Sequence, residues 1–355
     1  MVTSVVIRVF NRIPTPRSSI SFSTGPDSNI TNEAFWRGIK VYHQYVPSIV
    51  KAGAIGYNYL RAGPNGSFSF QNTITAPGMS PGQLEDFTMF MTRDFIKAGV
   101  PMINPRASYS DSPNPKIATR QAAPPVGNII GASLLSTRLL PRENFEKRDL
   151  FEATMAAIRN FTEVGGYTFH GINYSPTKEI AGWPGRDSGV NPHFRRTVTH
   201  AEAFEGQRAF VDMAKLKARH DRFQQFFQPW RDVSPTAGSY QNEADVMEPH
   251  WQWAFFGENY PRLLEIKKRF DPWDVFYATT AVGSEYWQIQ GPQLMKTQDG
   301  KLCRLAHPSS TWSVPAGFRE GEVFVPPETD ESASTKRAKG LVDSRRKTRS
   351  VRLHV

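Results

Sequence analysis

The chain has 355 residues, which is long enough for one large core or for two ordinary domains, and its formal net charge is +10. Residues 334–355 hold eight Lys and Arg residues against one Asp, so this end carries most of the charge and the remainder is close to neutral. That distribution argues against a nucleic-acid partner for the folded body. The single cysteine, Cys303, excludes a disulfide framework and a cysteine-based metal site. Because no apolar run reaches the roughly 18 residues of a membrane-spanning helix, we expect no membrane span.

The first hundred residues are predicted to form strands and helices in alternation. Residues 2–10 and 17–24 have the β-branched and alternating composition of strands. Apolar residues recur at helical spacing over 31–52 and over 80–99, in each case after a Thr or Ser cap and before a Gly. Between these helices, segment 54–76 is predicted to form a β-hairpin around a Gly-Pro-Asn-Gly turn.

The following part of the chain repeats the mixture of helices and strands. Residues 101–140 are rich in proline and are predicted to be loop. We expect a helix over 142–160, strands over 165–176 and 194–204, and a long helix from about 205 to 227. These units indicate an α+β fold in which an antiparallel sheet is backed by helices on one face.

The end of the chain differs in composition from the rest. After residue 304 the sequence turns to Pro, Ser and Glu and then to Lys and Arg, without periodic apolar residues. Such a segment cannot bury enough apolar surface to fold, so residues 305–355 are predicted to be a disordered basic tail.

Familiar catalytic motifs are missing from the sequence. The eight histidines are scattered, without an HxxxH pair or a close His/carboxylate cluster along the chain, so no metal site is predicted. No GxSxG, no GxxxxGK[ST], and no GxGxxG after a strand occurs. Hydrolases of that type, P-loop enzymes and Rossmann enzymes therefore lose their best support.

One segment, 239–277, combines polar residues, tryptophans and a short amphipathic helix: SYQNEADVMEPHWQWAFFGENYPRLLEIKKRFDPWDVFY. If its start is extended, Tyr240 and Asn242 lie on the same side. A phenol beside an amide could serve a flavin site, one as a general base and the other as a hydrogen-bond partner of the cofactor. The alternative is that both residues only tie down a turn, and spacing alone favours this structural role.

Several separated motifs stand in a fixed order along the second half of the chain. They are VNPHFR at 190–195, Tyr240-x-Asn242, the run from Trp251 to Lys267, Asp271-Pro272, VGSE at 282–285 and GKLCR at 300–304. In this order they resemble the C-terminal part of FAD-linked oxidases of the berberine bridge enzyme-like group, particularly fungal members. That group belongs to the vanillyl-alcohol oxidase/PCMH flavoprotein superfamily. The resemblance covers roughly residues 1–304 and is strongest over 230–304.

The resemblance implies an FAD domain of two α+β subdomains and a substrate domain whose antiparallel sheet is backed by helices. On this comparison, residues 1–14 are the last strand of a truncated FAD-binding domain and 15–230 the substrate domain. Residues 231–304 are the C-terminal segment that returns to the FAD domain, and 305–355 are the tail. The pyrophosphate loop and the flavin-linking residue would precede this chain, so its binding of FAD alone is expected to be weak.

The resemblance also implies roles for single residues. Tyr240 matches the tyrosine that acts as base or active-site phenol, and Asn242 matches an asparagine that contacts the flavin. The strand containing His170 and Asn173 matches one that faces the isoalloxazine, so both are candidates for the substrate pocket. A shift of one residue in register would exchange the two faces, so the sequence leaves open which of them points inward. The alternative for His170 is an ordinary core or surface histidine.

The implied activity is the oxidation of an alcohol, carbohydrate or secondary-metabolite substrate by hydride transfer to flavin. The loops at 101–140 and 179–192, which would shape the pocket, do not name this small molecule. One alternative is a non-catalytic remnant or binding protein whose basic tail sets the partner, and another is a separate polypeptide that supplies the missing lobe. The first ten residues lack a signal-peptide pattern, although members of the group are often secreted, so the compartment stays open.

Overall fold

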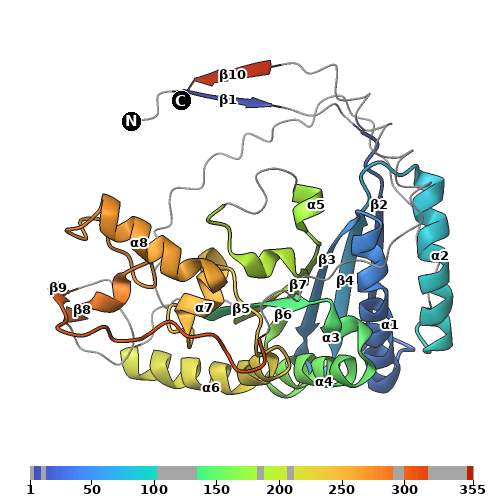
Figure 1. The fold of residues 1–355 in the computed structure, drawn as a ribbon. Coiled ribbons are helices and arrows are strands. Elements are labelled where there is room, and N and C mark those ends of the chain that lie inside the picture. Colours follow the sequence, from blue (N-terminus) through green and yellow to red (C-terminus); the bar gives the residue numbers. More distant parts are fainter. Residues whose placement is uncertain are drawn as a thin grey trace.

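The computed structural model describes residues 4–8, 13–101, 134–181, 188–205, 212–290, 300–318 and 350–354. Its centre is a six-stranded antiparallel sheet with the strand order β2-β4-β3-β6-β7-β5 (Figure 1). The strands are β2 (Arg17–Ser23), β3 (Ile55–Ala62), β4 (Phe68–Thr75), β5 (Leu134–Pro141), β6 (Thr168–Asn173) and β7 (Thr197–Glu205). The α+β class predicted from the sequence is confirmed.

Helices cover one face of this sheet (Figure 1). They are α1 (Asn32–Lys51), α2 (Pro81–Lys97), α3 (Glu143–Glu146), α4 (Arg148–Arg159) and α6 (Met213–Asp232). In the figure, α7 (Trp251–Phe256) and α8 (Tyr260–Phe270) lie on the opposite side of β5 from α6. None of the helices in the described ranges is long and apolar enough to cross a membrane.

Local capping explains where the first two long helices begin. The hydroxyl of Thr31 accepts a hydrogen bond from the Ala34 N–H at the start of α1. Ser80 and Gln83 form a reciprocal capping box at the start of α2. Gly53 follows α1 with φ at 74°, a conformation that costs least where there is no side chain. Both helices were predicted from these signals and are confirmed.

Alternation along the strands separates the side of the sheet that α1, α2, α4 and α6 cover from the opposite side, which these helices leave uncovered and which is called the helix-free face below. Leu60, Phe70 and Phe169 point into the helix layer and are fully buried. Burying one such side chain contributes about 1.5–3 kcal/mol, so this face supplies much of the stability. On the opposite face Tyr57 of β3 is 48% exposed. One face of the sheet therefore packs against the core, and the other is partly exposed to solvent.

The segment after α6 attaches to β5 by hydrogen bonds. The Leu139 N–H donates to the Gly238 carbonyl (2.8 Å), and the Ser239 hydroxyl donates to the Thr137 carbonyl (2.6 Å). The Tyr240 N–H then donates to the Thr137 hydroxyl (3.2 Å). Three successive residues are thus held at the edge of the sheet.

A second, smaller apolar cluster joins α7 and α8, with Trp251, Phe255 and Tyr260 among its buried members. Residues from the segment predicted to be a disordered tail pack against it. The Trp312 Nε1–H donates to the Gly257 carbonyl (3.0 Å), and Phe318 lies 4.8 Å from Trp253, ring centroid to ring centroid. These aromatic rings give residues 305–318 an apolar contact that the composition of the whole tail conceals, while the disordered tail stays a prediction.

The remaining described strands form two short antiparallel pairs. β8 (Trp287–Gln290) pairs with β9 (Lys301–Arg304). β1 (Ser4–Arg8) pairs with β10 (Ser350–His354), which lies within the predicted tail. Residues 319–349, which make up most of that tail, lie outside the described residues.

Two predicted boundaries in the middle of the chain differ from the structure. Residues 134–141 were predicted to be loop but form β5, because pairing with β7 satisfies their backbone groups at the sheet edge. The rest of the predicted proline-rich loop, 102–133, lies outside the described residues. The long helix expected from residue 205 begins at Met213, where the Asp212 carboxylate accepts from the Lys215 N–H. The division into domains at residues 14, 230 and 304 stays a prediction.

Close packing at Gly238 leads to a stability prediction. A Cβ at this position would collide with the His193 ring and the Ala254 carbonyl. We expect Gly238→Ala to lower the free energy of unfolding by about 1–3 kcal/mol, because the edge of β5 and α7 would have to move apart to make room for the methyl group. Urea denaturation measures this change. Gly82→Ala is the control, since no atom lies within 4 Å of its added Cβ. Equal stability of the two variants would contradict the packing argument.

Candidate active site

The register between β6 and β7 places histidines and a carboxylate on the helix-free face. His170 lies opposite Glu202, and Ile172 lies opposite His200. Since side chains alternate along a strand, His170, His200 and Glu202 share one face. That face is the one opposite Phe169, which is buried in the helix layer. The pairing of β6 with β7 therefore brings three titratable side chains together on the helix-free face.

His170 is held in one orientation by two contacts. Its ring stacks on Tyr59 with centroids 4.0 Å apart and planes parallel. Its Nδ1 lies 2.6 Å from Glu202 Oε2, within hydrogen-bond distance. The opposite nitrogen, Nε2, is buried and has no hydrogen-bond partner among the described residues. A buried, unpartnered ring nitrogen is a place where a polar ligand or water would be satisfied.

Asn173, the other predicted pocket residue, lies on the opposite side of the sheet. It is fully buried, and its Oδ1 accepts from the Tyr42 hydroxyl of α1 (2.5 Å). Its Nδ2 donates to the Thr199 hydroxyl (2.9 Å), and Asn58 Nδ2 donates to the same Oδ1 (3.2 Å). The pocket prediction for Asn173 is thus wrong in this structure. Its position three residues after His170, an odd interval, directs it to the core.

A third element brings Glu243 to the two β7 residues. Glu243 lies in the short 3-10 turn Gln241–Glu243, and its Oε2 is 3.8 Å from His200 Nδ1. Glu202 Oε1 is 3.9 Å from the same nitrogen. The prediction that no close His/carboxylate cluster exists is wrong, because it considered only spacing along the chain. In the fold, three ligand-type side chains gather at one point.

Burial and mutual contact set the protonation of this cluster. Burial lowers the pKa of His200 to about 4, so its imidazole is neutral near pH 7. Burial, together with the neighbouring Glu202 carboxylate, raises the pKa of Glu243 to about 7. Burial acts to raise the pKa of Glu202, but hydrogen bonds from His170 and Glu243 outweigh it and lower the value overall. Near neutral pH the two carboxyl groups share one proton.

The raised pKa of Glu243 predicts a pH-dependent contribution to stability. Its folded value of about 7 exceeds the ordinary 4.5, so the folded protein binds the proton more tightly. The stabilisation is complete below about pH 4.5 and is lost as the pH rises through about 7. We expect the stability of the wild type relative to Glu243→Gln to fall between about pH 5 and about pH 8, in urea denaturation. A stability difference between the two proteins that does not change with pH would contradict the proposal that Glu243 and Glu202 share a proton. The pKa of Glu202 is lowered, so this residue makes the stability increase with pH, but only below its ordinary pKa of 4.5.

Tyr240 and Asn242 meet above this cluster. The Asn242 Nδ2 donates to the Tyr240 hydroxyl (3.0 Å), so the predicted phenol and amide are side by side. The Tyr240 ring lies edge-on to His200 with centroids 5.7 Å apart, and it lies 5.4 Å from Phe194. Its backbone is fixed at β5 by the bond to Thr137. The roles of base and flavin contact stay predictions, but both side chains stand on the helix-free face.

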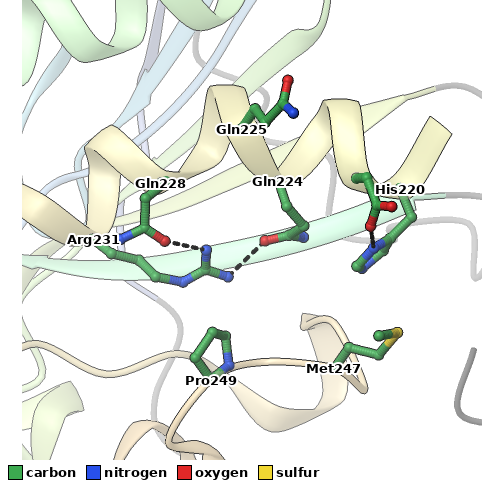
Figure 2. A pocket seen from close by; sticks show the side chains of 8 residues that line it. His220, Gln224, Gln225, Gln228, Arg231, Met247 and Pro249 are labelled. Carbon is green, nitrogen blue, oxygen red and sulfur yellow. Dashed lines mark hydrogen bonds and ion pairs between the residues drawn. The ribbon is translucent and has the colours of Figure 1, made fainter. Parts of the chain in front are cut away.

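A cavity of about 580 Å³ lies elsewhere, between α6 and residues 245–249. Figure 2 shows side chains of α6 on one side and Met247 and Pro249 on the other. The polar groups in it bind one another: the Arg231 guanidinium donates to the side-chain oxygens of Gln224 (2.8 Å) and Gln228 (3.2 Å) (Figure 2). His220 and Gln224 of α6 also bond to the Asp245 carboxylate, at 2.5 and 2.8 Å, which attaches the segment to the helix. These bonds leave few polar groups for a ligand.

The helix-free face fits one side of a flavin site. The unpartnered Nε2 atoms of His170 and His200, together with the Tyr240 hydroxyl, offer polar partners beside exposed aromatic rings. Such a mixture suits a planar, polar heterocycle such as an isoalloxazine ring. His200, Glu202 and Glu243 were not identified from the sequence as site residues. The only signal in the sequence is that His200 and Glu202 are two residues apart, which places both on one face of a strand. This signal indicates a site only when the positions of β6 and Glu243 are known.

Comparisons with known proteins show which proteins this chain is similar to. Residues 239–283 match the family model for berberine and berberine-like proteins. A VAO-type flavoprotein oxidase of Thermothelomyces thermophilus is 27% identical over 289 residues, which cover 78% of this chain and 46% of the relative. The FAD-linked oxidoreductase patO of Aspergillus clavatus is 26% identical over 311 residues, covering 86% and 50%.

A solved structure shares the fold. The crystal structure of a VAO-type flavoprotein from Myceliophthora thermophila matches with a TM-score of 0.63 at 22% identity, over 82% of this chain and 50% of that one. The fold is therefore one found within VAO-type flavoproteins. The chain resembles the berberine bridge enzyme-like group of FAD-linked oxidoreductases, in the VAO/PCMH family. It spans about half the length of the curated relatives that it matches.

Proposed function

We propose that the chain supplies the substrate side of an FAD-dependent oxidoreductase that oxidises an alcohol, carbohydrate or secondary-metabolite substrate. The observation that carries the proposal is the position of Tyr240, a phenol fixed on the helix-free face and hydrogen-bonded to Asn242. Similarity to FAD-linked oxidoreductases supports the use of FAD. The His170–Glu202 pair below it supports proton transfer at the same place.

In this proposal Tyr240 takes the proton from the substrate hydroxyl. The Asn242 amide, which donates to the phenolic oxygen, would stabilise the negative charge of the phenolate that acts as base. His200 contacts both the Tyr240 ring and the carboxyl groups of Glu202 and Glu243. Above about pH 7 this carboxyl pair has lost its shared proton and can receive one from the site. Bound FAD would supply the hydride acceptor of the reaction.

Residues around the cluster would exclude water and position the substrate. Tyr59 and Tyr57 line the same face beside His170, with centroids 4.0 and 5.9 Å from its ring. Tyr57 is 48% exposed and offers an aromatic face of the kind that binds the apolar face of a substrate ring. Exclusion of water strengthens each hydrogen bond in the site.

Co-expression provides the test. The chain is expressed with the FAD-binding half of the Thermothelomyces thermophilus VAO-type flavoprotein oxidase and purified through an affinity tag on this chain. We expect a yellow complex whose flavin absorption bleaches anaerobically with a member of a panel of alcohols and carbohydrates. The chain alone is expected to retain little or no FAD. A complex that holds FAD but is reduced by no compound would instead support a non-catalytic remnant, and a chain that retains FAD alone would overturn the expected weak binding.

A further inference from the structure

Three side chains on the helix-free face converge as ligands of a metal ion do. One nitrogen or oxygen atom each of His200, Glu202 and Glu243 lies within 4.8 Å of the other two. The two distances from His200 Nδ1 to the carboxylate oxygens are 3.8 and 3.9 Å. In a tetrahedral Zn²⁺ site with ligands about 2.1 Å from the ion, neighbouring ligand atoms are about 3.4 Å apart. The two distances from His200 exceed this value by a few tenths of an ångström, and the distance between the two carboxylate oxygens is at most 4.8 Å.

The orientation of the donors suits such an ion. His200 is 3% exposed, and its Nδ1 is directed at the oxygens of both carboxyl groups. Glu202 is oriented by His170, whose Nδ1 contacts the oxygen that does not face His200. Metal-ligating carboxylates are commonly held by such an outer partner.

Charge also favours a cation at this point. Within the described residues, the ion-pair partners of Glu202 and Glu243 are histidines only. Two converging carboxylates repel each other. Where no Lys or Arg pairs with them, a shared proton or a divalent cation can remove this repulsion. The Glu243 side chain is 43% exposed, which leaves a route from solvent and an open coordination position. One imidazole with two carboxylates is a ligand set for Zn²⁺ or a similar transition metal.

We propose that His200, Glu202 and Glu243 form a binding site for a divalent transition-metal ion of the Zn²⁺ class. His170 is the outer positioning residue of this site. The proposal goes beyond the proposed flavin-dependent function, because the site needs no flavin and can be measured on the chain alone. An ion bound there would occupy the carboxyl groups beneath Tyr240 and compete with their use in proton transfer.

The test is calorimetric titration of the tag-free chain with ZnCl₂ in metal-free buffer near neutral pH. We expect one site in the wild type, and an affinity lower by more than about tenfold in Glu243→Gln, which removes a ligand at a partly exposed position. Glu265→Gln, which changes an exposed carboxylate on α8, is the matched control and should keep the wild-type affinity. Far-UV circular dichroism and thermal unfolding establish that each variant is folded.

A second variant and a second metal distinguish binding at this site from a folding defect and from nonspecific binding of zinc. His170→Gln should weaken binding by about 10–100-fold while leaving one site, since it removes only the outer partner of Glu202. Co²⁺ in place of Zn²⁺ should give a visible absorption band in the wild type that Glu243→Gln lacks. Failure of the folded wild type to bind Zn²⁺, or equal affinity of Glu243→Gln and Glu265→Gln, overturns the proposal. Neither result bears on flavin binding, so the two proposals fail separately.

Discussion

Glu248→Gln is expected to lower the free energy of unfolding by about 3–5 kcal/mol, because it leaves buried arginines without their counter-ion. The Glu248 side chain is 1% exposed and accepts two hydrogen bonds from the Arg231 guanidinium, at 3.1 and 2.6 Å. Arg138 of β5 approaches the same carboxylate at 3.7 Å. Burial lowers the pKa of Arg138 to about 10, which still leaves it charged at neutral pH. Urea denaturation at pH 7 measures the change.

The matched control is Glu146→Gln, whose carboxylate pairs with Arg142 near the surface. The Glu146 side chain is 48% exposed, so its loss should cost at most about 1 kcal/mol. If the two variants lost the same stability, the pair at Glu248 would have to be as well solvated as the surface pair. A large loss at Glu248 alone would establish that this carboxylate joins α6, β5 and the segment that carries Tyr240.

Tyr240→Phe is expected to lower the rate of flavin reduction by substrate about 10²–10⁴-fold in the co-expressed complex, with FAD content unchanged. The phenylalanine ring preserves the packing on His200 and Phe194 but removes the hydroxyl that Asn242 contacts. Anaerobic stopped-flow measurement of flavin bleaching separates this step from reoxidation.

Tyr286→Phe serves as the control for this substitution. Tyr286 lies in the short turn Ser284–Tyr286 with Lys268 over its ring, and the loss of its hydroxyl should leave the rate unchanged. Equal rates for Tyr240→Phe and the wild type would remove Tyr240 as the base. In that case the Glu202–Glu243 pair would be the remaining proton acceptor on this face.

Local signals in the sequence were sufficient for much of the fold. Thr31 and Ser80 cap their helices as their types and positions predict. The hairpin of β3 and β4 follows from alternation around a Gly-containing turn. The contacts of Trp312 and Phe318 could not be predicted, because both are isolated apolar residues whose partners, Gly257 and Trp253, lie more than fifty residues earlier.

By itself, the sequence determined the α+β class and the resemblance to berberine bridge enzyme-like oxidases, and it singled out Tyr240 and Asn242. These depend on motifs and on neighbours only two residues apart. The tertiary structure alone decided that His170 faces the site while Asn173 faces the core, and that His200, Glu202 and Glu243 meet. The physical reason is that side chains alternate along a strand, so the register between β6 and β7 sets the face of every residue. Register depends on contacts across the whole sheet, which spacing along one strand does not contain.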